Sequence, residues 1–142
     1  MNDYAGSIIT LRQAADEAQA NGEVRTRNTA LNNAAVTEFL LGDLTAAKET
    51  YSMILEFDRK NSGPGAIALR LSNLSRVIAL QDEVAAAEKM NAEECQLQES
   101  MKAAVGTAWC HTRLAELWTE LGRKGEAQQL LTRLGQQPQT TR

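Results

Sequence analysis

The chain has 142 residues, which is enough for one domain with a hydrophobic core. Hydrophobic residues make up 43% of it and aromatic residues only 4%, so the core must be built from Leu, Ala, Ile and Val. The net charge of -3, with 15 Lys and Arg against 18 Asp and Glu, lacks the basic footprint of nucleic-acid binding. The apolar runs are far shorter than the ~18 residues that a membrane span needs.

The compartment expected from the sequence is the cytoplasm. The start, "MNDYAGSIITL", lacks the basic region of a secretory signal. Cys95 and Cys110 are too few for a disulfide framework, and free thiols are typical of a reducing compartment. We therefore expect both cysteines to be free.

The sequence predicts an all-α domain. Strong helix formers dominate long stretches, and no convincing run of alternating β-branched residues interrupts them. Asn21-Gly22, Gly42 and the segment "RKNSGPG" at 59–65 are typical helix ends, and Pro64 suits a first helical turn. The predicted helices, about seven, span 3–20, 23–41, 43–57, 65–81, 83–98, 101–121 and 123–134.

Two ends of the predicted helices are less sharply marked. The stretch 92–106 has no strong breaker, so one continuous helix there is an open alternative. Gly135 and Pro138 are expected to end the last helix, and residues 136–142 are expected to form a flexible tail.

An internal repeat with an offset of forty residues runs through the chain. The aligned turn residues are Gly42, Asp82 and Gly122. The aligned residues in the helices after these turns are Ala47, Ala87 and Ala127. Residues 3–20 then correspond to the second helix of a repeat whose first helix is absent. An apolar stripe runs along this helix from Tyr4 to Ala18. This helix is expected either to cap the array or to continue a longer one.

Residues 108–134, "AWCHTRLAELWTELGRKGEAQQLLTRL", resemble a tetratricopeptide repeat (TPR). The resemblance implies a single domain over 1–135. It would be a right-handed α-α superhelix, or solenoid, of about three helical hairpins at about 23–57, 65–98 and 101–134, preceded by the helix 3–20. The alanines at the offset of forty would let paired helices approach closely. The middle repeat departs from the pattern, because Asp82 replaces Gly, and Asn91 and Glu94 replace apolar residues.

The resemblance implies that the first helix of each repeat lines a concave groove that binds a protein or peptide. Carried onto this sequence, the predicted partner-binding residues are Asn32, Asn33, Val36, Asn73, Arg76, Trp109, Thr112, Arg113 and Glu116. Trp and Arg are common interface anchors, and a plain solvated helix face is the alternative interpretation. Only Asn73 and Arg113 match the clamp with which some family members hold a chaperone tail, so that partner is not expected.

No catalytic site, metal site or cofactor is predicted. His111 is the only histidine, and Cys110 projects about 100° away from it on a helix. A nucleophilic pair would need Cys95 brought to His111 across two helices, which we do not expect. The leading hypothesis is a non-catalytic interaction module. The alternative is a segment of a larger solenoid, or a self-associating scaffold that stacks through helices 3–20 and 123–134.

Overall fold

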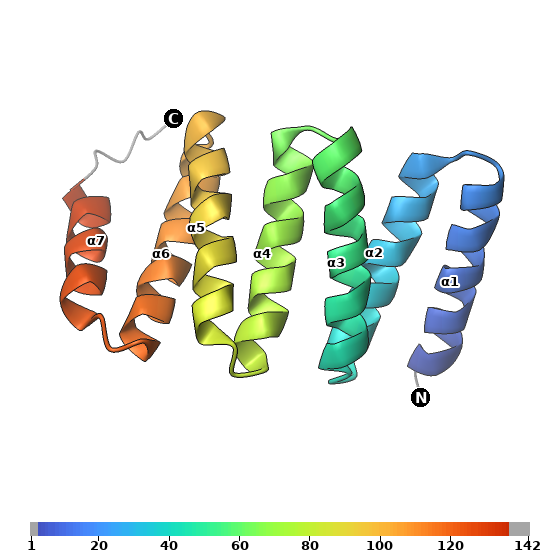
Figure 1. Ribbon diagram of the computed structural model, residues 1–142, viewed down its shortest axis with the longest axis horizontal. Helices are drawn as coiled ribbons and strands as arrows, with labels where there is room; N and C mark the ends of the chain where they lie inside the picture. Colours follow the sequence, from blue (N-terminus) through green and yellow to red (C-terminus); the bar gives the residue numbers. More distant parts are fainter. Residues whose placement is uncertain (1–2, 137–142) are drawn as a thin grey trace. The chain divides into compact units, whose positions relative to one another are not determined.

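Residues 3–136 are described in a computed structural model, and they form seven α-helices and no strand (Figure 1). The helices are α1 (Tyr4–Ala20), α2 (Val24–Leu40), α3 (Leu44–Asn61), α4 (Pro64–Leu80), α5 (Val84–Ser100), α6 (Ala104–Glu120) and α7 (Lys124–Gln136). The all-α prediction is thus confirmed for these residues. Successive helices begin twenty residues apart, so the repeat of forty found in the sequence is two helix-plus-turn units. None of the helices over 3–136 is long and apolar enough to span a membrane.

Five of the turns between helices have the same backbone geometry. In each, one residue after the helix takes a positive φ: Gly22, Gly42, Asp82, Lys102 and Gly122. Two backbone hydrogen bonds then close the helix end, as when Glu23 N donates to the Ala18 carbonyl and Gly22 N to that of Gln19. The sequence alignment of Gly42, Asp82 and Gly122 therefore corresponds to a shared conformation.

The turn at Lys102 decides the question that the sequence left open over 92–106. α5 ends at Ser100 and α6 begins at Ala104, so the stretch is not one continuous helix. Lys102 adopts φ 54° and closes the helix as glycine does elsewhere. A lysine carries no turn signal, which is why the sequence showed no breaker here.

Two helix ends differ from the sequence prediction. α3 was expected to stop at residue 57, but it continues to Asn61, where Arg59 and Lys60 lie favourably at the negative end of the helix dipole. α7 passes through Gly135, because a glycine that keeps helical angles costs only about 1 kcal/mol. α4 begins at Pro64, one residue before the predicted start, and the proline lies in the first helical turn as expected. Of the predicted tail, Gln136 is the last residue of α7, and 137–142, with Pro138, lie outside the described residues.

The chain divides into two compact units, residues 1–63 and 64–142. In the first unit α1 packs on α2 and α2 packs on α3. The core contains Ala15, Ala30, Leu31 and Ile54. The predicted stripe of α1 is largely used inside the unit, because Ala15 and Ala18 are buried and Ile8 and Leu11 half-buried.

A polar network crosses the first unit. The carboxylate of Glu38 is buried and forms an ion pair with Arg12 of α1. Thr50 Oγ1 of α3 donates to Glu38 Oε2 over 3.0 Å, and Arg12 Nη2 lies 3.1 Å from Thr50 Oγ1. Three helices are therefore joined through one buried carboxylate.

In the second unit α4 packs on α5, α5 on α6, and α6 on α7. Its core includes Leu114, Ala115, Ala127 and Leu130, with Trp118 packed against them. The alanines at the offset of forty, Ala47, Ala87 and Ala127, are all buried, as expected for closely packed helices.

The two cysteines are not free thiols, so that expectation is wrong. Cys95 of α5 and Cys110 of α6 form a disulfide, with a Cα–Cα distance of 5.4 Å. Cys95 lies seven residues before Lys102 and Cys110 eight residues after it, and an antiparallel helical hairpin brings residues at such nearly equal distances opposite each other. The sequence did not predict this disulfide, because it left undecided whether a turn interrupts residues 92–106. The disulfide also removes one of the arguments for a reducing compartment.

Candidate functional site

A hollow of about 240 Å³ lies in the second unit and is lined by side chains of α4 and α6. Its lining residues are Ser72, Arg76, Trp109, Cys110, Thr112, Arg113 and Glu116. Trp109, Thr112 and Glu116 of α6 follow the i, i+3, i+7 spacing, so they lie on the same face of the helix. The hollow is a surface depression with two arginines and one tryptophan around it.

Five of the residues predicted from the sequence meet at this hollow: Arg76, Trp109, Thr112, Arg113 and Glu116. The sixth predicted residue of this unit, Asn73, is half-buried on α4 and does not line it. Its neighbour Ser72 does, because successive residues of a helix project about 100° apart.

The other three predicted residues belong to α2 in the first unit. Asn33 lines a second hollow, of about 390 Å³, together with Arg25, Thr26 and Thr29. Val36 is exposed, Asn32 is half-buried, and neither lines this hollow. The first unit therefore holds a separate and more open depression.

The electrostatics of the hollow in the second unit centre on Arg113. Burial lowers the pKa of its guanidinium, and the like charge of Arg76 lowers the pKa further, while the carboxylates of Glu116, Glu94 and Glu120 raise it. Arg113 Nε is buried and donates no hydrogen bond. Two neighbouring guanidinium groups that repel each other are stabilised when an anion binds between them.

Glu94 of α5 is the buried carboxylate beside this site. Burial raises its pKa, while a hydrogen bond from Ser72 and the charge of Arg113 lower it, and the upward effect is larger. One of its oxygens, Oε2, accepts no hydrogen bond. Glu94 thus lies behind the site as a carboxylate with incomplete hydrogen bonding.

Trp109 is 73% exposed although it is a large aromatic residue. Trp118 of the same helix is half-buried, and its Nε1 donates to Glu88 Oε1 over 3.0 Å. Trp118 therefore packs within the fold, whereas the indole of Trp109 lies largely outside the core. An exposed indole beside two arginines can cover an apolar group while the arginines bind a carboxylate.

Besides Ser72, two residues of this region, Glu94 and Cys110, were absent from the predicted site. Glu94 carried a usable signal, because it stands where the repeat pattern places an apolar residue. Cys110 carried none, since a small buried cysteine looks like any core residue in a helix.

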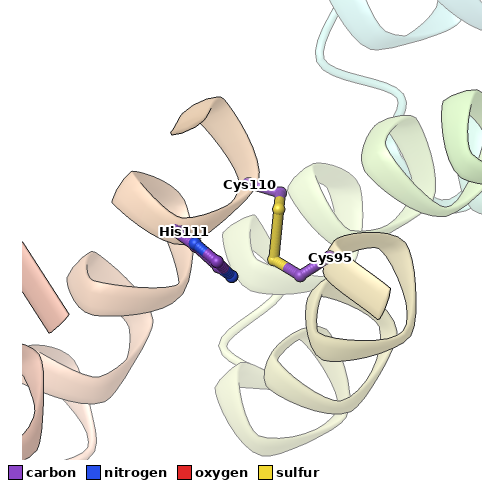
Figure 2. Close-up of side chains that lie close together, drawn as sticks. All are labelled: Cys95, Cys110 and His111. Carbon is purple, nitrogen blue, oxygen red and sulfur yellow. A yellow bond between two sulfur atoms is a disulfide. The ribbon is translucent and has the colours of Figure 1, made fainter. Parts of the chain in front are cut away.

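Cys95, Cys110 and His111 form a cluster in the second unit, and Figure 2 shows the imidazole ring reaching from α6 toward the two sulfur atoms. The ligand atoms of all three lie within 4.8 Å of one another. Cys110 and His111 therefore lie close together at their ends, although their side chains leave the helix about 100° apart. The imidazole is long enough to reach α5, where its Nε2 lies 2.8 Å from Glu99 Oε1.

The comparisons with known proteins bear on the fold. No protein-family model matches the chain, and no curated protein matches it. The crystal structure of BtubC (BKLC) from P. vanneervenii is similar to this chain, with a TM-score of 0.73 and 14% identity. The match covers 92% of this chain and 55% of that one, so this chain spans about half its length. At this identity the likeness concerns the fold alone.

Proposed function

We propose that this protein is a non-catalytic interaction module that binds a protein or peptide in the groove of a TPR-like superhelix. The binding site is the hollow of the second unit, and the bound segment carries an acidic side chain or a terminal carboxylate. The observation that carries the proposal is the placement of Arg76 and Arg113 around one hollow with the exposed Trp109. The cytoplasmic location remains a prediction.

The residues suggest how such a segment would be held. The carboxylate would accept hydrogen bonds from the guanidinium groups, and a neighbouring apolar group would cover the indole. Glu116, on the same side of the hollow, would disfavour a second acidic group next to the first. The expected ligand is therefore acidic at one position and apolar at the next.

The test is a selection from a displayed peptide library, followed by titration of matched peptides. Each selected peptide is compared with a copy in which Asp or Glu is replaced by Asn or Gln. We expect the amide copy to bind about tenfold more weakly, as the loss of a charge-assisted hydrogen bond predicts. The affinity of the acidic peptide should also fall as the salt concentration rises.

Three variants test whether the peptide binds in this hollow. Arg113→Gln and Trp109→Ala should each weaken the acidic peptide, by about tenfold or more, because central Arg and Trp anchors carry most of the binding energy. Val105→Ala is the matched control, since Val105 is also 73% exposed on α6 but does not line the hollow. If all three variants bind the acidic peptide as tightly as the wild-type protein does, the hollow is not the binding site.

The alternative is a segment of a larger solenoid or a self-associating scaffold. It is supported by large apolar side chains that the terminal helices leave exposed, Ile9 on α1 and Leu131 on α7. Sedimentation velocity over a wide concentration range tests it. Association that Ile9→Asp or Leu131→Asp abolishes would favour this function, and a monomer at all concentrations would exclude self-association.

A further inference from the structure

We propose that reduction of the Cys95–Cys110 disulfide creates a binding site for a thiophilic divalent metal ion such as Zn²⁺, with Cys95, Cys110 and His111 as ligands. Two thiolates and one imidazole are ligands that Zn²⁺ prefers, and three protein ligands leave its fourth position open to water. Cys110 also lines the hollow proposed above as the peptide site, but the metal site does not depend on peptide binding.

The geometry of the three side chains fits such an ion. Their ligand atoms lie within 4.8 Å of one another, and the two cysteine Cα atoms are 5.4 Å apart. Zn–S bonds of about 2.3 Å in a tetrahedral site place two sulfur atoms about 3.8 Å apart. Once the S–S bond is broken, side-chain rotation can reach that separation while the helices stay in place.

The surroundings supply the contacts that metal ligands need. Asn91 Nδ2 lies 3.5 Å from Cys95 Sγ and can donate to the sulfur, which stabilises a thiolate. Glu99 Oε1 lies 2.8 Å from His111 Nε2, an arrangement that orients the ring of a metal-binding histidine. Both cysteines are buried, and the His111 side chain is 17% exposed, so the imidazole is the most accessible of the three ligands.

The chemistry balances with a thiol or phosphine reductant. Reduction adds two electrons and two protons to the disulfide, giving two thiols. Two thiol groups of the reductant supply them and form a disulfide, or one phosphine and one water molecule supply them and the water oxygen ends in the phosphine oxide. The metal ion then binds two thiolates, and two protons are released to solvent. Reoxidation expels the ion, so disulfide and metal exclude each other.

The test uses the full chain and Co²⁺ as a spectroscopic probe. The protein is reduced with a phosphine, desalted under argon, and assayed for two free thiols per chain. Titration with Co²⁺ should then give thiolate-to-cobalt charge-transfer bands and the visible bands of a tetrahedral site, saturating at one ion per chain. Added Zn²⁺ should abolish these bands.

The oxidised wild-type chain is the matched control, because it has the same sequence and no thiolates. Cys95→Ser and Cys110→Ser should each lose the charge-transfer bands at equal Co²⁺. Glu99→Gln should bind about 10- to 100-fold more weakly, as loss of a contact to a histidine ligand predicts. His111→Ala should change the visible bands, because a nitrogen ligand is replaced by water.

Circular dichroism of every sample separates ligand loss from unfolding. The proposal is overturned if reduced, folded wild-type protein gives no bands, or if the bands persist in both cysteine variants. It is equally overturned if the reduced chain unfolds and Co²⁺ does not restore its helical signal.

Discussion

Asn91 of α5 donates a hydrogen bond of 2.8 Å from its Nδ2 to the backbone carbonyl oxygen of Cys110 on α6. Asn91 is fully buried, and its Oδ1 accepts no hydrogen bond. The repeat pattern places an apolar residue at this position, so the chain holds a half-satisfied amide between two helices. The hydrogen bond from Nδ2 stabilises the contact between the two helices, whereas the buried Oδ1 has lost its hydration without gaining a hydrogen bond.

Substitution of Asn91 should separate these two effects. Asn91→Ala leaves a cavity and removes the bond, and we expect it to lower the free energy of unfolding by about 2 kcal/mol. Asn91→Leu keeps the branched shape with somewhat more bulk and removes the unpartnered Oδ1, so its cost should be smaller, about 1 kcal/mol. Urea denaturation monitored by circular dichroism measures both. A leucine variant as unstable as the alanine variant would contradict this account.

The turns give a second prediction, because Lys102 and Asp82 hold positive φ angles of 54° and 63°. Glycine adopts this region without the steric cost that a side chain brings. Lys102→Gly should raise the free energy of unfolding by about 1 kcal/mol, and Asp82→Gly by less, since Asp tolerates this conformation better than Lys.

The control for these glycine variants lies within the same unit. Lys89→Gly removes an exposed lysine from the interior of α5, where glycine should lower stability by about 1 kcal/mol. Thermal and urea melts should therefore show opposite signs for residues 102 and 89. Equal signs would mean that removal of the lysine charge, rather than backbone conformation, decides the result.

The buried carboxylate of the first unit leads to a third prediction. Arg12→Met keeps the aliphatic stem but leaves Glu38 buried without its positive partner, and we expect a loss of about 2 kcal/mol. Thr50 still donates to Glu38, which limits the loss. The double variant Arg12→Met with Glu38→Met should lose less than Arg12→Met alone, because no unpaired charge remains. A double-mutant cycle measured by urea denaturation checks this, and additive losses would show that the ion pair contributes nothing.

A fourth prediction concerns pH. Burial raises the pKa of Glu94 above 4.5, so the folded protein binds this proton more tightly than the unfolded chain does. The stability that this group contributes is present in acid and is lost as the pH rises through its folded-state pKa. Glu94→Gln should therefore gain stability relative to wild type between pH 4.5 and neutral pH. Urea denaturation of both proteins across this range measures the difference, and a pH-independent difference would contradict the raised pKa.

Much of the fold followed from the sequence, because helix formers, turn glycines and the offset of forty all act locally along the chain. The one helix end without such a signal was at Lys102, where the surrounding packing imposes a conformation that lysine does not favour. From this one turn follow the disulfide and the cluster around His111, which were both missed. Which residues pair across a hairpin depends on the position of its turn. When the sequence does not predict the turn, the contacts between the two helices cannot be predicted either.

The candidate site was predictable for a different reason. Arg76, Trp109 and Arg113 were found because the helix register places them on the expected face, and register is a property of the sequence. Glu94 was recognised as unusual but could not be placed, since its orientation depends on how α5 packs between its neighbours. Asn73 was one helix position away from the hollow, a difference that only side-chain geometry decides.

The twenty-residue spacing of the helices limits which repeats could replace one another in this chain. α4, α5 and α6 each have 17 residues, about 25 Å of helix at 1.5 Å per residue. A TPR unit usually has 34 residues, which leaves each helix about three residues, or 4.5 Å, shorter. Grafted in place of α6 and α7, such a unit would not reach the end of α5 at which Trp118 bonds to Glu88. Only modules of forty residues are therefore interchangeable here, and chimeras should be assembled from such modules.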